Sequence, residues 1–156
     1  KTTTTINLAA SLASQGKKVL IIDADPQANA TSGFGIDPKS MTSSIYECLV
    51  DEYPLDGSQI ATCVKGLDLV GSRIDLAGAE LELVSKSDRE KVLARLLEPI
   101  KEKYDYILID CPAGIHEGFM LMSSKAQKAL VVATPELISV KASFSKLITP
   151  SFELTT

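Results

Sequence analysis

Cysteine and histidine, the residues of disulfide frameworks and zinc sites, are scarce in this sequence. The three cysteines, Cys48, Cys63 and Cys111, are widely spaced, odd in number and in no C-x-x-C arrangement. This pattern indicates neither a disulfide framework nor a zinc site, and a reducing cytoplasm is the simplest location for such a chain. Cys111 is expected to be a small buried hydrophobe, because nothing near it in sequence clearly lowers the pKa of its thiol. The single histidine, His116, is expected to be a solvent-facing loop residue.

Long apolar runs and an excess of positive charge are also missing. No apolar stretch approaches the roughly 20 residues that span a bilayer, and no signal-peptide pattern opens the chain. The formal net charge of −4 and the pI near 5.0 give the chain no overall electrostatic footprint for nucleic acid, although a local basic patch would not show in this sum. With 156 residues, of which 45% are hydrophobic, the chain fits one globular domain.

The chain opens on what looks like the end of a phosphate-binding loop. Lys1 and Thr2 are followed by apolar residues at helical spacing. In the full pattern, G-x-x-x-x-G-K-[ST], backbone amides of the glycine-rich loop surround the phosphates, the lysine reaches the β/γ-phosphates and the threonine binds Mg²⁺. The glycines and an initiator methionine are not present, so we expect a truncated N-terminus. The alternative is an ordinary N-terminal helix in which the threonines are caps.

Strands and helices alternate along the rest of the chain. Strands are predicted at residues 19–22, 67–70, 104–109 and 129–133, and helices at 3–15, 42–50, 74–84, 88–103, 119–126 and 139–147. We expect Thr42 or Ser43 to cap the second helix, Ser87 or Asp88 to cap the fourth, and Pro99 to interrupt the fourth. Residues 29–38 are predicted to be a loop, and residues 51–66 are ambiguous. Because the strands alternate with helices and are apolar rather than half-polar, the pattern predicts a three-layer α/β domain with a mainly parallel sheet.

Three acidic residues follow predicted strands. Asp23 and Asp25 end the first strand before Pro26, and Asp110 ends the third. In a parallel sheet these acids emerge at the same edge as Lys1 at its helix N-terminus, and together they have the chemistry of a nucleoside triphosphate site with Mg²⁺. Alternatively, the acids could be caps and solvated loop residues, or Asp23 and Asp25 could bind a divalent metal without a nucleotide. Pro26 should give these two acids different partners.

Three stretches resemble the ParA/Soj-type partition ATPases: KTTTTINLAASLASQGKKVLIIDADPQANATSGFGID, GLDLVGSRIDLAGAELELV and YDYILIDCPAG. These proteins belong to the deviant phosphate-loop family with MinD and the nitrogenase iron protein. The resemblance is to ParA/Soj over residues 1–111 and to MinD and flagellar-number regulators after that. It implies a single partial domain over residues 1–156, in which the first strand and the glycine-rich loop are missing and the sheet lacks a central strand.

The resemblance assigns phosphate contacts to five positions. Lys1 resembles the loop lysine on the β/γ-phosphates, a catalytic as well as a binding role, and Thr3 would lie against the α-phosphate. Thr2 resembles the Mg²⁺ ligand next to these phosphates. Pro112 and Gly114 resemble the ends of the second switch, which senses the γ-phosphate. The family's other signature lysine belongs to the glycine-rich segment, so ATP hydrolysis by residues 1–156 alone is not assumed.

The resemblance also assigns the metal and the attacking water. Thr2, Asp23 and Asp110 match the Mg²⁺-associated positions, with Asp23 near the metal shell and Asp110 as the acid of the second strand motif. Asp25 resembles the residue that orients or activates the water.

The function implied by the resemblance is a cytoplasmic, Mg²⁺-dependent ATPase that dimerises on ATP and acts in chromosome or plasmid partitioning. The complete protein would bind DNA non-specifically and a ParB-like activator. A MinD-like or flagellar-placement role, with membrane binding if MinD-like, is the alternative within the family. A nucleotide-switched binding module with incidental hydrolysis, and a fragment with neither activity, are the alternatives outside it.

Overall fold

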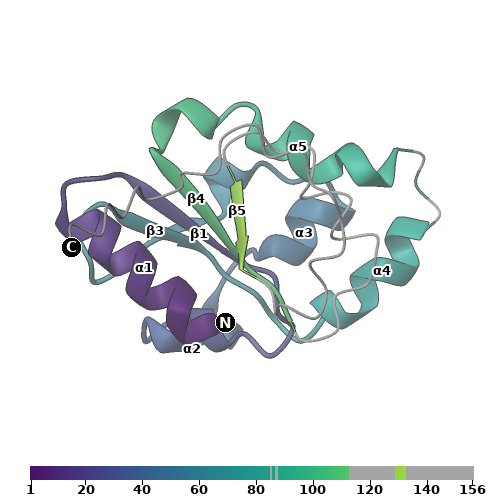
Figure 1. The fold of residues 1–156 in the computed structure, drawn as a ribbon. Coiled ribbons are helices and arrows are strands. Elements are labelled where there is room, and N and C mark those ends of the chain that lie inside the picture. Colours follow the sequence, from purple (N-terminus) through teal and green to yellow (C-terminus); the bar gives the residue numbers. More distant parts are fainter. Residues whose placement is uncertain (85, 87, 113–128, 133–156) are drawn as a thin grey trace, which may run out of the picture.

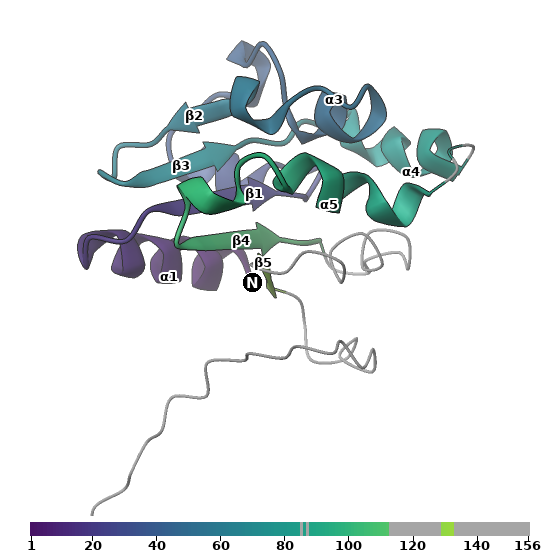
Figure 2. The same ribbon diagram turned by 90° about the horizontal axis from the view of Figure 1, so that it is seen from above.

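The computed structural model describes residues 1–84, 86, 88–112 and 129–132. These residues form a five-stranded sheet in the order β2-β3-β1-β4-β5. The parallel strands are β1 (Val19–Asp23), β3 (Leu67–Val70), β4 (Tyr106–Asp110) and β5 (Ala129–Val132). The short strand β2 (Gln59–Ala61) runs antiparallel to β3 at one edge, as Figure 2 shows. The predicted strands are confirmed, and β2 lies in the stretch that the sequence left ambiguous.

Strand β1 lies at the centre of this sheet and explains the apolar pattern. All five of its residues are buried, as expected for a parallel strand covered on both faces. Val19 pairs with Tyr106 and Asp23 with Asp110, so that β1 and β4 end level with each other. Strand β4 is paired on its other side with β5. The expected loss of a central hydrogen-bonding partner is therefore not seen in the described sheet.

Helices cover both faces of the sheet, which confirms the three-layer α/β architecture (Figure 1). Helices α1 (Thr2–Ser14) and α2 (Asn29–Gly33) pack on one face. The other face carries α3 (Ile45–Val50), α4 (Leu76–Val84) and α5 (Val92–Leu97). Alternate residues of β1 serve the two cores: Val19 and Ile21 face α1, and Leu20 and Ile22 face the opposite helices. In the part of the chain that is described, no helix is both long and apolar enough to cross a bilayer.

The predicted loop over residues 29–38 is wrong in its first half. Residues Asn29–Gly33 form α2, although Asn, Thr, Ser and Gly are poor helix formers. Ala28 precedes the helix in the left-handed conformation, with φ of 53°. The helix is held by a contact from elsewhere in the fold, because the Asp23 carboxylate accepts a hydrogen bond from the Thr31 amide at 2.8 Å.

Two predicted helix boundaries also need correction. The second helix is capped by Ser44 rather than by Thr42 or Ser43, because Ser44 and Glu47 form a capping box. The fourth helix is not continuous: a 3-10 turn at Arg89–Lys91 leads into α5, and a second one follows at Lys101–Lys103, beyond Pro99. Asp88 is the N-cap residue of the first turn, and its side chain makes no capping hydrogen bond.

A third 3-10 turn (Pro38–Ser40) and a fourth (Leu55–Gly57) lie in the connections around α3. The helices predicted at residues 119–126 and 139–147, with Ser87 and His116, lie outside the described residues.

Candidate functional site

The ends of β1 and β4 meet the first turn of α1 at the carboxyl edge of the sheet. Asp23 and Asp110 are register partners, and both side chains are fully buried. The Ala24 amide donates to the Asp110 carbonyl oxygen at 2.8 Å, which continues the pairing past the strand ends. From α1, the Thr5 hydroxyl lies 3.1 Å from Asp110 Oδ1. The predicted meeting of the α1 start with two strand-terminal acids is therefore observed.

Two buried atoms of opposite charge at this edge have no partner in the described structure. They are Asp110 Oδ2 and Lys1 Nζ. Groups of opposite charge attract each other strongly at low dielectric, yet no hydrogen bond joins these two atoms. Both charges act on the adjacent Cys111 thiol: burial, together with the Asp110 charge, raises its pKa to about 12, against the lowering effect of the Lys1 charge. Cys111 is thus buried and protonated, as predicted from the sequence.

Asp23 is fully engaged with the protein around it. Its Oδ2 accepts hydrogen bonds from the Thr31 amide at 2.8 Å and the Thr31 hydroxyl at 2.7 Å, and its Oδ1 accepts from the Asp25 amide at 3.1 Å. Burial raises the Asp23 pKa to about 6, against the lowering effect of these hydrogen bonds, and the Asp110 charge adds to the rise. Asp23 therefore organises the chain that follows β1.

Asp25 lies beyond the strand and is only half-buried. Its Oδ1 accepts a hydrogen bond from the Gln27 amide at 2.9 Å, which shapes the turn around Pro26. Asp23 and Asp25 thus have different partners, as the position of Pro26 predicted. Asp25 is therefore the more accessible of the two acids.

The other predicted positions differ in exposure. Thr2 and Pro112 are half-buried and Thr3 is exposed, whereas Gly114 lies outside the described residues. Helix α1 has no side-chain cap and no acidic residue in its first turn, so its N-terminal amides are not masked by a carboxylate. Among the described residues, no group of three or more His, Cys, Asp or Glu side chains could hold a metal ion by itself. A metal at this edge would need ligands of another kind, such as phosphate oxygens, which is the usual way in which proteins bind Mg²⁺.

Sequence reasoning missed Thr5 and Thr31, the two threonines that hold the acids. Both are fully buried. The available signal for Thr5 was its place on the buried face of α1, one turn before Ala9 and two before Ala13. A hydroxyl on an otherwise apolar helix face requires a partner, and here that partner is Asp110.

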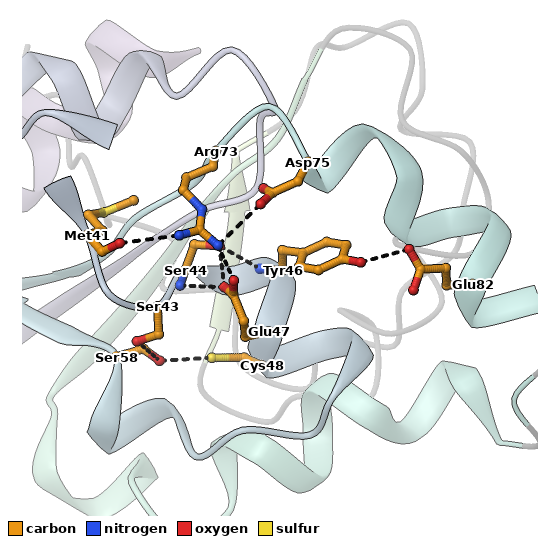
Figure 3. A network of polar contacts seen from close by, with 10 residues as sticks. All are labelled: Met41, Ser43, Ser44, Tyr46, Glu47, Cys48, Ser58, Arg73, Asp75 and Glu82. Atoms are coloured by element: carbon orange, nitrogen blue, oxygen red, sulfur yellow. Dashed lines mark hydrogen bonds and ion pairs between the residues drawn. The ribbon is translucent and has the colours of Figure 1, made fainter. Parts of the chain in front are cut away.

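A polar network next to the site fixes α3 and α4 against the end of β3 (Figure 3). Arg73 bonds the Glu47 carboxylate, donates to the Met41 carbonyl oxygen at 3.2 Å and lies 3.2 Å from an Asp75 oxygen. Tyr46 donates to Glu82 of α4 at 2.7 Å. Burial alone would raise the pKa of Glu47, but hydrogen bonds from Ser44 and the Arg73 charge lower it. These contacts connect helices to one another. The candidate site is formed instead by residues of α1, β1 and β4.

The sequence model of the AAA domain (AAA_31) matches residues 1–150. The chain belongs to this family of ParA-type ATPases. It is 50% identical over 115 residues to the sporulation initiation inhibitor protein Soj of Bacillus subtilis. This match covers 74% of the present chain and 46% of Soj. It is 42% identical over 147 residues to the chromosome partitioning protein ParA of Myxococcus xanthus. This second match covers 94% of the present chain and 50% of that ParA. The chain thus spans about half the length of these ParA-type relatives.

A solved structure has the same fold. The cobyrinic acid a,c-diamide synthase of Mycobacterium smegmatis, with a bound ATP analogue and magnesium, matches with a TM-score of 0.76 and 33% identity. The match covers 83% of this chain and 53% of the synthase. The resemblance inferred from the sequence motifs is confirmed.

Proposed function

We propose that the protein is a Mg²⁺-dependent ATPase of the ParA/Soj type. The observation that supports this most is the pair of buried, unpartnered atoms Lys1 Nζ and Asp110 Oδ2. A ligand that satisfies both presents a hydrogen-bond acceptor or negative charge to the lysine, and a donor or positive charge to the carboxylate. A nucleotide phosphate with its Mg²⁺ does both, and the synthase that shares this fold has an ATP analogue and magnesium bound.

In this proposal the first turn of α1 binds the phosphates. Lys1 contacts the β/γ-phosphates, Thr3 the α-phosphate, and the free N-terminal amides add hydrogen-bond donors. Thr2 and Asp110 hold Mg²⁺, which when bound neutralises charge on the phosphates during transfer.

The residues after β1 serve the attacking water. Asp23, whose oxygens accept hydrogen bonds from Thr31 and Asp25, orders this segment and would lie near the Mg²⁺. Asp25 orients the water, and Pro112 and Gly114 sense the γ-phosphate. Catalysis then rests on positioning and charge rather than on covalent chemistry.

The cellular role proposed here is chromosome or plasmid partitioning, through a homodimer that forms on ATP binding. The match to ParA of Myxococcus xanthus extends over 147 residues, beyond residues 1–111, where the sequence motifs resemble ParA/Soj. This longer match supports the partitioning role over a MinD-like role. In the cytoplasm, the protein would bind DNA without sequence specificity and would also bind a ParB-like activator. A membrane partner belongs to the MinD-like alternative.

Asp25→Ala tests the proposed mechanism, and Asp37→Ala is a matched control. Both acids precede a proline and accept a hydrogen bond from the amide two residues on, Asp25 from Gln27 and Asp37 from Lys39. We expect Asp25→Ala to lower ATP turnover about 100-fold or more while ATP binding and ATP-dependent dimerisation persist. Asp37→Ala should leave turnover unchanged. Equal turnover in wild type and Asp25→Ala would sink the assigned role.

A further inference from the structure

Thr5 is a buried hydroxyl on the apolar side of α1. Its side chain is fully buried, and the residues that share its face of the helix, Ala9 and Ala13, are alanines. A hydroxyl in such a place lowers stability unless it is hydrogen-bonded. Packing alone would be served equally well by an apolar residue of the same shape.

The Thr5 hydroxyl has two possible acceptors and one proton to donate. The Lys1 carbonyl oxygen lies at 3.2 Å and Asp110 Oδ1 at 3.1 Å. The Lys1 carbonyl already accepts the Thr5 amide at 2.8 Å, so the helix does not need the hydroxyl there. A carboxylate is the stronger acceptor, and we therefore assign the proton to Asp110.

This bond joins two halves of the candidate site that lie far apart in sequence. Thr5 follows Lys1 by one helical turn on α1, whereas Asp110 ends β4, 105 residues later. One oxygen of Asp110 is held by Thr5, and the other, Oδ2, is buried without a described partner. The carboxylate is thus fixed in one orientation, with one oxygen left for a ligand.

We propose that Thr5 is a positioning residue for Mg²⁺, which holds Asp110 so that Oδ2 faces the metal bound beside Thr2. This inference rests on the proposed function. In this proposal Thr5 itself contacts neither the nucleotide nor the metal. It acts through Asp110, as the hydrogen-bond partners of metal ligands commonly do, and removing such partners weakens metal binding about 10- to 100-fold.

The test measures how binding of a fluorescent ADP derivative to the full-length protein depends on Mg²⁺. Thr5→Val removes the hydroxyl and keeps the shape, and Thr5→Ser keeps the hydroxyl. The matched control is Thr62→Val, because the Thr62 hydroxyl donates to the Leu67 carbonyl oxygen at 2.8 Å, at the opposite edge of the sheet. If Thr5→Val does not fold, Thr5→Ala, which favours the helix, replaces it.

For Thr5→Val we expect the Mg²⁺ concentration at half-maximal ADP binding to rise about tenfold or more. ADP affinity in excess EDTA should stay within about twofold of wild type, because the hydroxyl acts on the metal ligand alone. Thr5→Ser and Thr62→Val should keep the Mg²⁺ dependence of wild type. An unchanged Mg²⁺ dependence in Thr5→Val, or a Thr5→Ser variant as impaired as Thr5→Val, would overturn this inference and leave the ATPase proposal standing. Wild type that binds no ADP with Mg²⁺ would overturn both.

Discussion

Replacing Thr31 by valine removes a hydroxyl that serves two buried groups at once. The hydroxyl donates to Asp23 Oδ2 at 2.7 Å and accepts the Ser72 amide at 3.0 Å. The variant therefore weakens the support of a buried carboxylate and leaves the Ser72 amide without its acceptor. The Thr31 amide still donates to Asp23, so the loss is confined to the side chain.

The expected loss of stability follows from these two bonds. A hydrogen bond to a charged group contributes about 1.5–3 kcal/mol, and a buried donor without a partner costs about 1–3 kcal/mol. Because one hydroxyl serves both and the effects are not additive, we expect Thr31→Val to lower the free energy of unfolding by about 2–5 kcal/mol near neutral pH. Thr31→Ser keeps the hydroxyl and should lose no more than about 1.5 kcal/mol, through the missing methyl group.

The loss should also depend on pH, because the partner titrates. In the folded protein burial raises the pKa of Asp23 from 3.8 to about 6. At Asp23 the folded state therefore binds more protons than the unfolded state between these values, so that the contribution of Asp23 to wild-type stability falls by about 3 kcal/mol as the pH rises from about 4 to about 6. Removing the Thr31 hydroxyl raises the folded pKa of Asp23 further. The variant therefore continues to lose stability above about pH 6, where wild type has stopped.

Urea unfolding of wild type, Thr31→Val and Thr31→Ser between about pH 4.5 and 8, followed by circular dichroism, measures this difference. We expect the destabilisation by Thr31→Val to grow by about 1–2 kcal/mol over this range, as a charge-assisted bond is lost. The growth should disappear in an Asp23→Asn background, which has no carboxylate to titrate. A destabilisation by Thr31→Val that is the same at every pH would refute the reasoning.

Two further predictions concern other parts of the fold. Glu47→Ala removes both the capping box of α3 and the partner of Arg73, and should lower the free energy of unfolding by about 1–3 kcal/mol in urea titrations. Glu98→Ala, in an exposed ion pair, should change it by no more than about 0.5 kcal/mol, and similar losses in the two variants would contradict the account of Figure 3. Exposed Cys63 should react with a thiol reagent at pH 8. Cys111 should react only on unfolding, because its thiol is buried and its pKa is raised to about 12. Mass spectrometry of partly labelled protein measures which cysteine has reacted.

The strands and their common edge could be predicted because parallel strands carry their signal locally. Residues 19–22 are continuously apolar, and residues 67–70 are apolar apart from Asp68, a pattern that is typical of strands whose two faces are both covered by helices. Once the order of strands and helices is known, the carboxyl ends of β1 and β4 must emerge on one edge. Asp23 and Asp110 could therefore be placed together without a structure.

The elements that were missed depend on contacts between distant residues. Helix α2 has a sequence that disfavours helix, and it exists because the Asp23 carboxylate holds Thr31 from the end of another element. Similarly, the bond between Thr5 and Asp110 depends on how α1 packs against β4, which no local pattern records. The Ser44 cap is different, since S-x-x-E from Ser44 to Glu47 was a readable capping signal.

The most direct test of the central claim is calorimetric titration of the full-length protein with a non-hydrolysable ATP analogue, with and without Mg²⁺. The account predicts binding that is stronger with Mg²⁺, that is lost in Lys1→Ala, and that loses its Mg²⁺ dependence in Asp110→Asn. No binding by wild type, or binding that both variants retain unchanged, would contradict it. The unpartnered Lys1 and Asp110 atoms would then have to be explained without a nucleotide.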